Sequence, residues 1–365
     1  MNFNAFDYKC MVTALQLAHL GLETTHPNPR VGCVISRDGQ IVGQGWHKKA
    51  GEAHAEVFAL REAGDKAVGG TAYITLEPCS HTGRTPPCVD ALIKAKVTRV
   101  VFAIGDPNPD VNGSGLERLQ QAGIEVQSGL MATAAEELNC GFLQRMRMRR
   151  PWVRIKLAQS MDGHIALANG GSQWISGPES RSDVQNWRAR SDAIVTGIGT
   201  VLADDPSLNV RKSEAARQPS RIIVDSQWRT PVTARLLTLP GKVLIAGSAE
   251  KPVPDALRKS AADCVELPSL EGRVDMQALF NVLAVRGYNE VQVEAGATLC
   301  GTLLQQRLVD ELLIYQAPSI LGGAAVSPFA LPRLDNMVDR VHLKWVDARR
   351  IGNDLRLRLQ PVYPD

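Results

Sequence analysis

The segment 76–88 has the sequence LEPCSHTGRTPPC, and its two cysteines, Cys79 and Cys88, lie nine residues apart. Upstream, His54 and Glu56 flank an alanine in the triplet HAE. One neutral imidazole and two thiolates give Zn²⁺ three protein ligands and leave its fourth tetrahedral position for water. Zinc lowers the pKa of that water to about 7, and a neighbouring carboxylate can carry its proton to a leaving amine. We therefore predict one zinc ion held by His54, Cys79 and Cys88, with Glu56 as the catalytic proton carrier.

The spacing of His54 and Glu56 restricts where they can lie. Residues two apart on a regular helix point to nearly opposite sides, so this pair cannot converge in the middle of a helix. The helical pattern of apolar residues begins only near His54. We therefore expect both residues at the irregular first turn of a helix.

Zinc deaminases carry the signature H-x-E followed by P-C-x-x-C. Here the two cysteines are farther apart, and this longer loop indicates a particular group. Together with HPNP at 26–29 and VGCV at 31–34, the loop closely resembles the bifunctional deaminase and reductase of riboflavin biosynthesis. The resemblance covers essentially the whole chain.

For the first half, the resemblance implies a cytidine-deaminase-like three-layer domain over residues 1–149, acting as a zinc-dependent pyrimidine deaminase. It places the loop over the substrate, so His81 and Arg84 would meet the ribose phosphate or the ring. Asn28 would hydrogen-bond the pyrimidine. The remaining cysteines are expected to be structural: Cys10, Cys33, Cys140, Cys264 and Cys300.

The order of elements in the first half indicates an α/β domain. Strands alternating with helices predict a mainly parallel sheet covered on both faces. The expected helices are 7–20, 53–63, 89–96, 116–122 and one from 133. The expected strands are 31–36 and 41–46, which should pair with each other, then 71–76, 99–104 and one near 124. At 145–151 the sequence RMRMRRP, a charged helix end followed by proline, predicts the domain boundary. The length of 365 residues also suggests about two domains.

In the second half, residues 150–365, the alternation of strands and helices begins again. A helix should begin after Ser176, with Pro178 in its first turn. No G-x-G-x-x-G motif follows the first strand, so a Rossmann domain is not indicated. Instead, VQVEAGATL at 291–299 predicts a strand, a glycine turn and a helix whose free N–H groups would receive a phosphate. The expected strands are 152–158, 193–197, 221–225, 242–246, 290–294 and 311–316.

Four further motifs resemble the reductase half of the same family, which has a dihydrofolate-reductase-like fold. They are KLAQSMDG at 156–163, SQWI at 172–175, GTVLADDP at 199–206 and EAG at 294–296. By this resemblance, the second half is an NADPH-dependent reductase domain. The implied NADPH contacts are Ala158, Trp174, Thr200, Asp204, Ser226, Gly296, Ala297, Thr298 and Leu299. The implied substrate contacts are Ser172, Arg188, Leu208, Arg211 and Glu294.

Three residues of this half are predicted to be catalytic. A hydride must reach C1′ of the ribosylamine, and the acceptor we expect is the ring-opened iminium. Glu294 would stabilise its positive charge, Asp204 would hold the nicotinamide ribose, and Lys156 would hydrogen-bond the released sugar oxygen. The plainer alternatives are a surface salt bridge between Lys156 and Asp204, core packing of Trp174, and a solvated surface position for Arg188 and Arg211.

The amino-acid composition limits the class of protein and the partners that we expect. Hydrophobic residues make up 44% of the chain and charged residues 22%, which is typical of packed globular domains. A net charge of +3 over this length gives no strong positive surface for binding a polyanion such as nucleic acid. Seven irregularly spaced cysteines argue against a secreted disulfide framework and favour a protein of the reducing cytoplasm. We expect neither a nucleic-acid nor a membrane partner, and the resemblance implies a homo-oligomer, either a dimer or a tetramer.

The leading prediction is one enzyme with two active sites. The first would hydrolyse the 2-amino group of a diaminopyrimidinone ribosylamino 5′-phosphate, and the second would reduce its ribosyl group to ribityl with NADPH. One alternative is a nucleic-acid base deaminase with an accessory binding domain, which needs a positive groove and stacking aromatics. Another is an interaction module with structural zinc, which Glu56 argues against because structural sites normally have four protein ligands.

Overall fold

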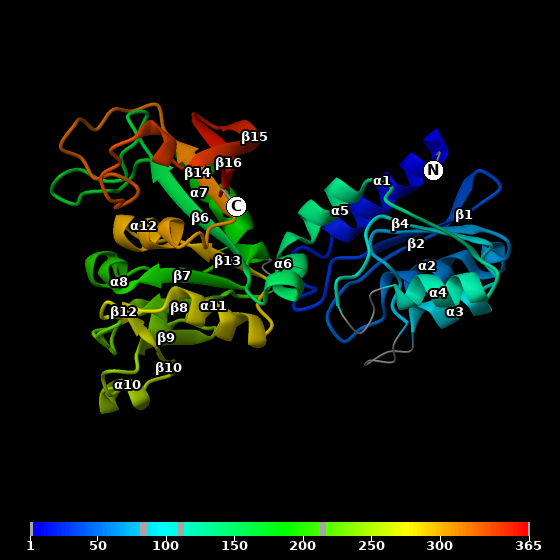
Figure 1. Cartoon of the computed structure of the whole chain (residues 1–365), viewed down its shortest axis with the longest axis horizontal. Coiled ribbons are helices and arrows are strands. Elements are labelled where there is room, and N and C mark those ends of the chain that lie inside the picture. Colours follow the sequence, from blue (N-terminus) through cyan, green and yellow to red (C-terminus); the bar gives the residue numbers. More distant parts are fainter. Residues whose placement is uncertain (1–2, 81–86, 109–112, 212–216, 364–365) are drawn as a thin grey trace. The chain divides into compact units, whose positions relative to one another are not determined.

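The computed structural model describes residues 3–80, 87–108, 113–211 and 217–363 (Figure 1). The chain divides into two compact units, residues 1–149 and 150–365. None of the described helices has the length and apolar character needed to span a bilayer.

The first unit is built on a five-stranded sheet with the order β2-β1-β3-β4-β5. Its strands are β1 (Gly32–Arg37), β2 (Gln40–Trp46), β3 (Thr71–Ile74), β4 (Arg99–Phe102) and β5 (Glu125–Ser128). Its helices are α1 (Ala5–His19), α2 (Ala55–Ala63), α3 (Cys88–Lys94), α4 (Ser114–Gln121), α5 (Ala132–Leu138) and α6 (Cys140–Met148), with a 3₁₀ turn at Gly64–Ala67.

This sheet is mixed, so the expectation of a mainly parallel sheet was wrong for the first unit. β1 is antiparallel to both β2 and β3, whereas β3, β4 and β5 are parallel. The reason is the tight turn between β1 and β2, where Asp38 and Gly39 have φ of 48° and 73°. Two consecutive residues with positive φ are typical of a two-residue hairpin, which requires antiparallel strands.

Buried side chains alternate between the two faces of the central strands and pack against helices on both faces, which gives three layers. Val34, Tyr73 and Val101 face α1 and α5, while Ile35 and Ile74 face the layer of α2 and α3. Successive side chains of a strand point to opposite faces, so each strand contributes to both cores. In Figure 1, α1 and α5 lie on one side of this sheet and α2, α3 and α4 on the other. The three-layer, cytidine-deaminase-like arrangement is confirmed.

The second unit contains a nine-stranded sheet with the order β10-β9-β8-β7-β13-β6-β14-β16-β15. The strands are β6 (Trp152–Gln159), β7 (Ala193–Gly197), β8 (Ser220–Val224), β9 (Val243–Ser248), β10 (Asp263–Leu267), β13 (Glu290–Val293), β14 (Glu311–Gln316), β15 (His342–Ile351) and β16 (Asp354–Val362), and β11 (Ser269–Leu270) and β12 (Arg273–Val274) form a separate hairpin. The helices are α7 (Pro178–Arg190), α8 (Ile198–Asp204), α9 (Arg235–Thr238), α10 (Asp255–Arg258), α11 (Met276–Val285) and α12 (Ala297–Gln305), with a 3₁₀ turn at Met337–Asp339.

From β10 to β14 every neighbouring pair of strands is parallel, whereas the pairs β14–β16 and β16–β15 are antiparallel. All six predicted strands are present, and α7 begins at Pro178 as expected. Because parallel strands end at the same edge of a sheet, the residues that follow β6, β13, β7 and β8 gather there. In register, Val293 pairs with both Ile155 and Val195, so Lys156, Glu294 and Thr196 lie side by side at that edge.

Candidate active sites

In the first unit the fold brings together the three predicted zinc ligands. The ligand atoms of His54, Cys79 and Cys88 all lie within 4.8 Å of one another. His54 is the N-cap of α2, and its Nδ1 lies 3.1 Å from Cys88 Sγ and 3.5 Å from Cys79 Sγ. Cys88 begins α3, and Cys79 lies in the connection after β3. The donor set, one imidazole and two thiols with room for a fourth ligand, fits Zn²⁺.

The electrostatics of this cluster favour a ligand thiolate. Hydrogen bonds from Cys88 and His54 lower the pKa of Cys79 well below that of an ordinary thiol, although burial opposes the shift. The thiolate is the form of cysteine that binds metal. Cys79 is therefore prepared for coordination by its neighbours.

His54 and Glu56 lie at the irregular first turn of α2, as predicted. His54 has an extended backbone, with φ −77° and ψ 167°, and α2 begins one residue later. This break allows both side chains to line the same cavity of about 440 Å³. Glu56 is only 3% exposed, and its Oε2 makes no hydrogen bond to the described residues. A buried carboxylate oxygen without a partner among the described residues, on a side chain that lines a cavity beside a metal-type cluster, fits a group that exchanges a proton with a ligand there.

The same cavity contains the predicted residue Asn28 and one residue that the sequence analysis missed. Asn28 Nδ2 lies 3.1 Å from Nε2 of His47, and both side chains line the cavity. Burial lowers the pKa of His47, whose Nδ1 lies 3.1 Å from the carbonyl oxygen of Ala53. A single histidine after a strand has no spacing signal, so no pattern in the sequence selects it. The other two predicted substrate residues, His81 and Arg84, lie outside the described residues.

The cysteines expected to be structural are divided between core and partly exposed positions. Cys10, Cys33 and Cys300 are buried in hydrophobic clusters. Cys140 and Cys264 are partly exposed. Among the described residues, none of these five belongs to a metal-type cluster.

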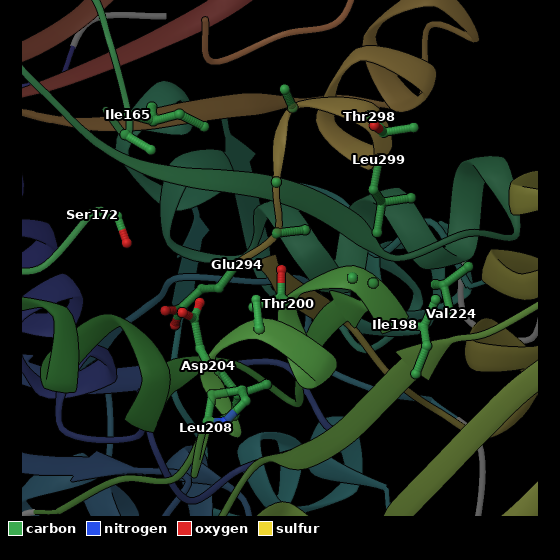
Figure 2. A pocket seen from close by; sticks show the side chains of 18 of the residues that line it. Ile165, Ser172, Ile198, Thr200, Asp204, Leu208, Val224, Glu294, Thr298 and Leu299 are labelled. Atoms are coloured by element: carbon green, nitrogen blue, oxygen red, sulfur yellow. The ribbon is translucent and has the colours of Figure 1, made fainter. Parts of the chain in front are cut away.

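In the second unit, a cavity of about 1080 Å³ lies at the carboxyl edge of the parallel strands. All the predicted reductase residues line it: Lys156, Ala158, Ser172, Trp174, Arg188, Thr200, Asp204, Leu208, Arg211, Ser226, Glu294, Gly296, Ala297, Thr298 and Leu299. Figure 2 shows Thr200 and Asp204 on α8 near Glu294, with Thr298 and Leu299 at the start of α12. That start has no side-chain cap, so its backbone N–H groups are available to a phosphate.

Glu294 and Arg188 form a bidentate ion pair on the cavity wall. Arg188 Nε lies 2.7 Å from Oε1 and Nη2 lies 2.8 Å from Oε2, and Gln292 donates a further hydrogen bond of 2.9 Å to Oε1. Burial would raise the pKa of Glu294, but the charge and hydrogen bonds of Arg188 outweigh it and hold the pKa at about 2. The carboxylate is therefore ionised and already neutralised by a partner.

Lys156 lies beside this pair. Burial lowers the pKa of its ammonium, the Glu294 charge raises it, and the Arg188 charge lowers it. Among the described residues, no ion pair joins Lys156 to Asp204, so the alternative of a surface salt bridge between them is wrong. Two of the other plain alternatives also fail: Trp174 is 68% exposed rather than packed in the core, and Arg188 is paired rather than solvated. Arg211 is exposed, as its plain alternative expects.

The ion pair also changes what Glu294 can do. We expected its carboxylate to stabilise the positive charge of the iminium, and the structure pairs that carboxylate with a bidentate arginine that offsets its charge. The sequence could not reveal this, because Arg188 and Glu294 are 106 positions apart. Further cavity residues that the sequence analysis missed include Arg181, whose guanidinium lies 4.8 Å from the centre of the Trp174 ring.

The two units define a class of protein. One is a three-layer fold with a zinc-type cluster and a buried glutamate, as in deaminases, and the other is a parallel α/β fold with a large cavity at its carboxyl edge, as in nucleotide-dependent reductases.

Comparison with known proteins gives the family. Residues 5–104 match the cytidine and deoxycytidylate deaminase zinc-binding region, and residues 151–357 match the RibD C-terminal domain. Riboflavin biosynthesis protein RibD of Escherichia coli (strain K12) is 50% identical over 97% of this chain and 99% of that protein. The corresponding protein of Haemophilus influenzae is 44% identical over 99% of both chains.

Solved structures agree over the full length. Acinetobacter baumannii RibD (form 1) superposes with a TM-score of 0.91 at 45% identity, covering 98% of this chain and 99% of that one. A Thermotoga maritima protein, described as a diaminohydroxyphosphoribosylaminopyrimidine deaminase/5-amino-6-(5-phosphoribosylamino)uracil reductase, superposes with a TM-score of 0.87 at 29% identity, with the same coverage. The chain belongs to the RibD family of bifunctional deaminase–reductases of riboflavin biosynthesis.

Proposed function

We propose that residues 1–149 deaminate 2,5-diamino-6-ribosylamino-4(3H)-pyrimidinone 5′-phosphate by hydrolysis, releasing ammonia. Residues 150–365 would then reduce the ribosyl group of the product to ribityl with NADPH. The observation that carries the first step is the convergence of His54, Cys79 and Cys88 around the buried Glu56. The Thermotoga maritima protein, whose description names both activities, supports assigning both to one chain.

In the first cavity, the zinc ion held by His54, Cys79 and Cys88 would supply an acidified water molecule. Glu56 would accept the proton of that water at its unpartnered Oε2 and return it to the nitrogen that leaves as ammonia. Asn28 would hydrogen-bond the pyrimidine, and its contact with His47 fixes the orientation of its amide. Burial of Glu56 excludes the competing bulk water that would otherwise exchange its proton.

In the second cavity, NADPH would supply a hydride to C1′ of the opened sugar. Lys156 would hydrogen-bond the sugar oxygen that is released on opening. Because Arg188 neutralises Glu294, we assign Glu294 to two tasks: it holds Arg188 against the substrate side of the cavity, and it supports the positive charge of Lys156. Asp204, at the end of α8, would hold the nicotinamide ribose.

The remaining predicted contacts with NADPH and with the substrate would be made by residues that line the same cavity. Ala158, Trp174, Thr200, Ser226 and the start of α12 would contact NADPH, with the α12 N–H groups receiving a phosphate. Ser172, Leu208 and Arg211 would contact the substrate together with Arg188 and Glu294. The homo-oligomer stays a prediction, which light scattering on the purified protein would check.

The test combines metal analysis with two separate assays on the pure protein. We expect about one zinc per chain, ammonia release from the diaminopyrimidinone phosphate, and NADPH oxidation when the deaminated compound is supplied. Ammonia release without zinc, or zinc without ammonia release, would contradict the first assignment. Failure of the deaminated compound to oxidise NADPH would contradict the second.

A further inference from the structure

We propose that Arg229, Arg235 and Arg273 bind the 2′-phosphate of the adenosine half of the dinucleotide and thereby set a preference for NADPH over NADH. The inference rests on the proposed reductase function and adds the residues that select the cofactor. All three side chains are exposed and line the cavity of the second unit.

The three arginines lie at the opposite end of this cavity from the reacting groups. Lys156 is on β6 and Glu294 follows β13, whereas Arg229 follows β8. In the sheet, β8 is three strands away from β6, through β13 and β7. Strands are spaced about 4.8 Å apart, so the two ends are roughly 14 Å apart. The α12 start lies between them, after β13, where the pyrophosphate of a dinucleotide would sit.

The backbone that carries each arginine is fixed by a separate hydrogen bond. Thr230, next to Arg229, donates from its N and Oγ1 to Asp225 Oδ2, at 2.7 and 2.8 Å. The amide of Arg235 donates to Asp205 Oδ1 at 2.7 Å. The segments that carry Arg229 and Arg235 are therefore held in place independently of any ligand.

Arg273 is held by the β11–β12 hairpin. Glu271 and Gly272 at its turn have φ of 52° and 71°, which is typical of a two-residue hairpin turn. The next residue after Arg273 is Val274, whose amide donates to Ser226 Oγ at 3.0 Å. This bond ties the hairpin to the connection after β8, so Arg273 is presented beside Ser226, a residue already assigned to NADPH.

Among the described residues, no carboxylate compensates the charges of these three arginines. Elsewhere in the unit, exposed arginines such as Arg258 and Arg286 lie within 3.3 Å of a carboxylate. Within the described ranges, Arg229, Arg235 and Arg273 have no carboxylate oxygen within 4.0 Å. Three guanidiniums at one end of a cavity, without a carboxylate partner in the described part of the chain, attract an anion that carries two negative charges, and arginine matches the geometry of phosphate oxygens.

The carboxylates that line the same cavity do not cancel this charge. Asp205 faces the backbone amide of Arg235, and Glu294 is paired with Arg188 at the far end. Asp204 lines the cavity on α8, where we assigned it to the nicotinamide ribose. A 2′-hydroxyl, as in NADH, would offer these arginines no charge, so the cluster discriminates between the two cofactors.

The same chemistry could bind the 5′-phosphate of the pyrimidine substrate, and the geometry argues against it. Arg211, which also lines the cavity, has its amide bonded to Gln185 Oε1 on α7 at 3.0 Å, and α7 also carries Arg188. Arg211 therefore lies toward the substrate end, where it can receive that phosphate. The experiment must still separate the two phosphates.

The test uses adenosine 2′,5′-bisphosphate and 5′-AMP, which differ only by the 2′-phosphate, and measures their affinities for the full-length protein by calorimetry. We expect the wild-type protein to bind the bisphosphate at least tenfold more tightly than 5′-AMP. Arg229→Ala, Arg235→Ala and Arg273→Ala should each reduce that ratio, and the triple variant should bring it close to one. Arg258→Ala, which removes an exposed arginine of the same unit away from the cavity, should leave the ratio unchanged.

Kinetics provide the second readout. The ratio of kcat/KM for NADPH to kcat/KM for NADH should fall at least tenfold in the triple variant, with little change for NADH. A retained ratio, or a higher KM for the pyrimidine phosphate with the cofactor ratio unchanged, would overturn the proposal. If the triple variant does not fold, the three single variants decide on the same criterion. Failure of the wild-type protein to oxidise either cofactor would instead refute the reductase function itself.

Discussion

The Lys156, Glu294 and Arg188 cluster predicts opposite changes in the pH dependence of NADPH oxidation for two substitutions. The Glu294 charge raises the pKa of Lys156 and the Arg188 charge lowers it. Glu294→Gln should therefore lower the pKa of Lys156, and Arg188→Met should raise it. If the protonated Lys156 is the active form, activity is lost as the pH rises through its pKa. The alkaline limb should move to lower pH in Glu294→Gln and to higher pH in Arg188→Met.

The size of the shift follows from the separation of the charges. Lys156 and Glu294 follow the paired residues Ile155 and Val293 on neighbouring strands, which lie about 4.8 Å apart, and they form no ion pair within 4.0 Å among the described residues, so we take a charge separation on the order of 6 Å. At an effective dielectric of about 20, two unit charges at that distance interact by roughly 3 kcal/mol. Since about 1.4 kcal/mol corresponds to one pKa unit, removing the Glu294 charge should move the limb by about one to two pH units, and removing the Arg188 charge should move it in the opposite direction.

Arg188→Met has a second expected effect, at acidic pH. Arg188 holds the pKa of Glu294 at about 2, and without it burial raises that pKa. A depressed carboxyl pKa stabilises the folded protein above the unfolded pKa of about 4.5, and this stabilisation is lost as the pH falls toward 2. The variant should therefore lose stability relative to wild type at pH 5 and above, and less so at pH 3.

The assay is the pH profile of kcat/KM for the deaminated substrate, from pH 5 to 10.5, with ammonia release as the control for the first unit. In a Lys156→Met background the alkaline limb should no longer respond to either substitution. Shifts in the same direction for both variants, or an unmoved limb, would refute the assignment of the limb to Lys156.

Three further predictions test the remaining assignments. Glu56→Gln should keep zinc by metal analysis but slow ammonia release by about 10² to 10⁴ fold, because the amide cannot carry a proton; near-normal release would remove Glu56 from the mechanism. Lys156→Ala should slow NADPH oxidation at least about tenfold with zinc and ammonia release intact, a loss of about 1.4 kcal/mol of transition-state stabilisation, and a normal oxidation rate would return Lys156 to a structural role. Limited proteolysis should cut first near Arg149, and the fragment 1–149 should fold with zinc; a fragment that cannot do so would argue against that boundary.

The features that the sequence predicted well are those encoded within short segments. His54 and Glu56 could be placed at a helix start because two residues on opposite sides of a regular helix can converge only there. The buried parallel strands of the second unit were predicted because their apolar runs are continuous: β7 reads AIVTG and β8 reads SRIIV. In both cases local residue order decides the outcome.

Features that depend on distant residues could not be predicted. The β15–β16 hairpin was missed because β15 is mostly exposed and reads HLKWVDARRI, without a sustained apolar alternation. The Arg188–Glu294 pair was missed because β13 and α7 are brought together only by the folded sheet. The antiparallel start of the first sheet is different, because the residues Asp38 and Gly39 at its turn were visible in the sequence and their consequence for strand direction was not drawn.

The distribution of charge in the second cavity bears on how a dinucleotide would be oriented. At the reacting end, the Arg188 charge is matched by Glu294, which leaves Lys156 as the single uncompensated cation of that trio. At the other end, Arg229, Arg235 and Arg273 face the cavity without carboxylate partners among the described residues. A ligand with a 2′-phosphate at one end and a nicotinamide at the other is therefore drawn in with its phosphate toward the arginines, because the reversed orientation would forfeit their attraction. That orientation directs the nicotinamide toward Lys156 and Glu294. On this reasoning, the three arginines proposed to select the cofactor also help to orient its nicotinamide toward the substrate.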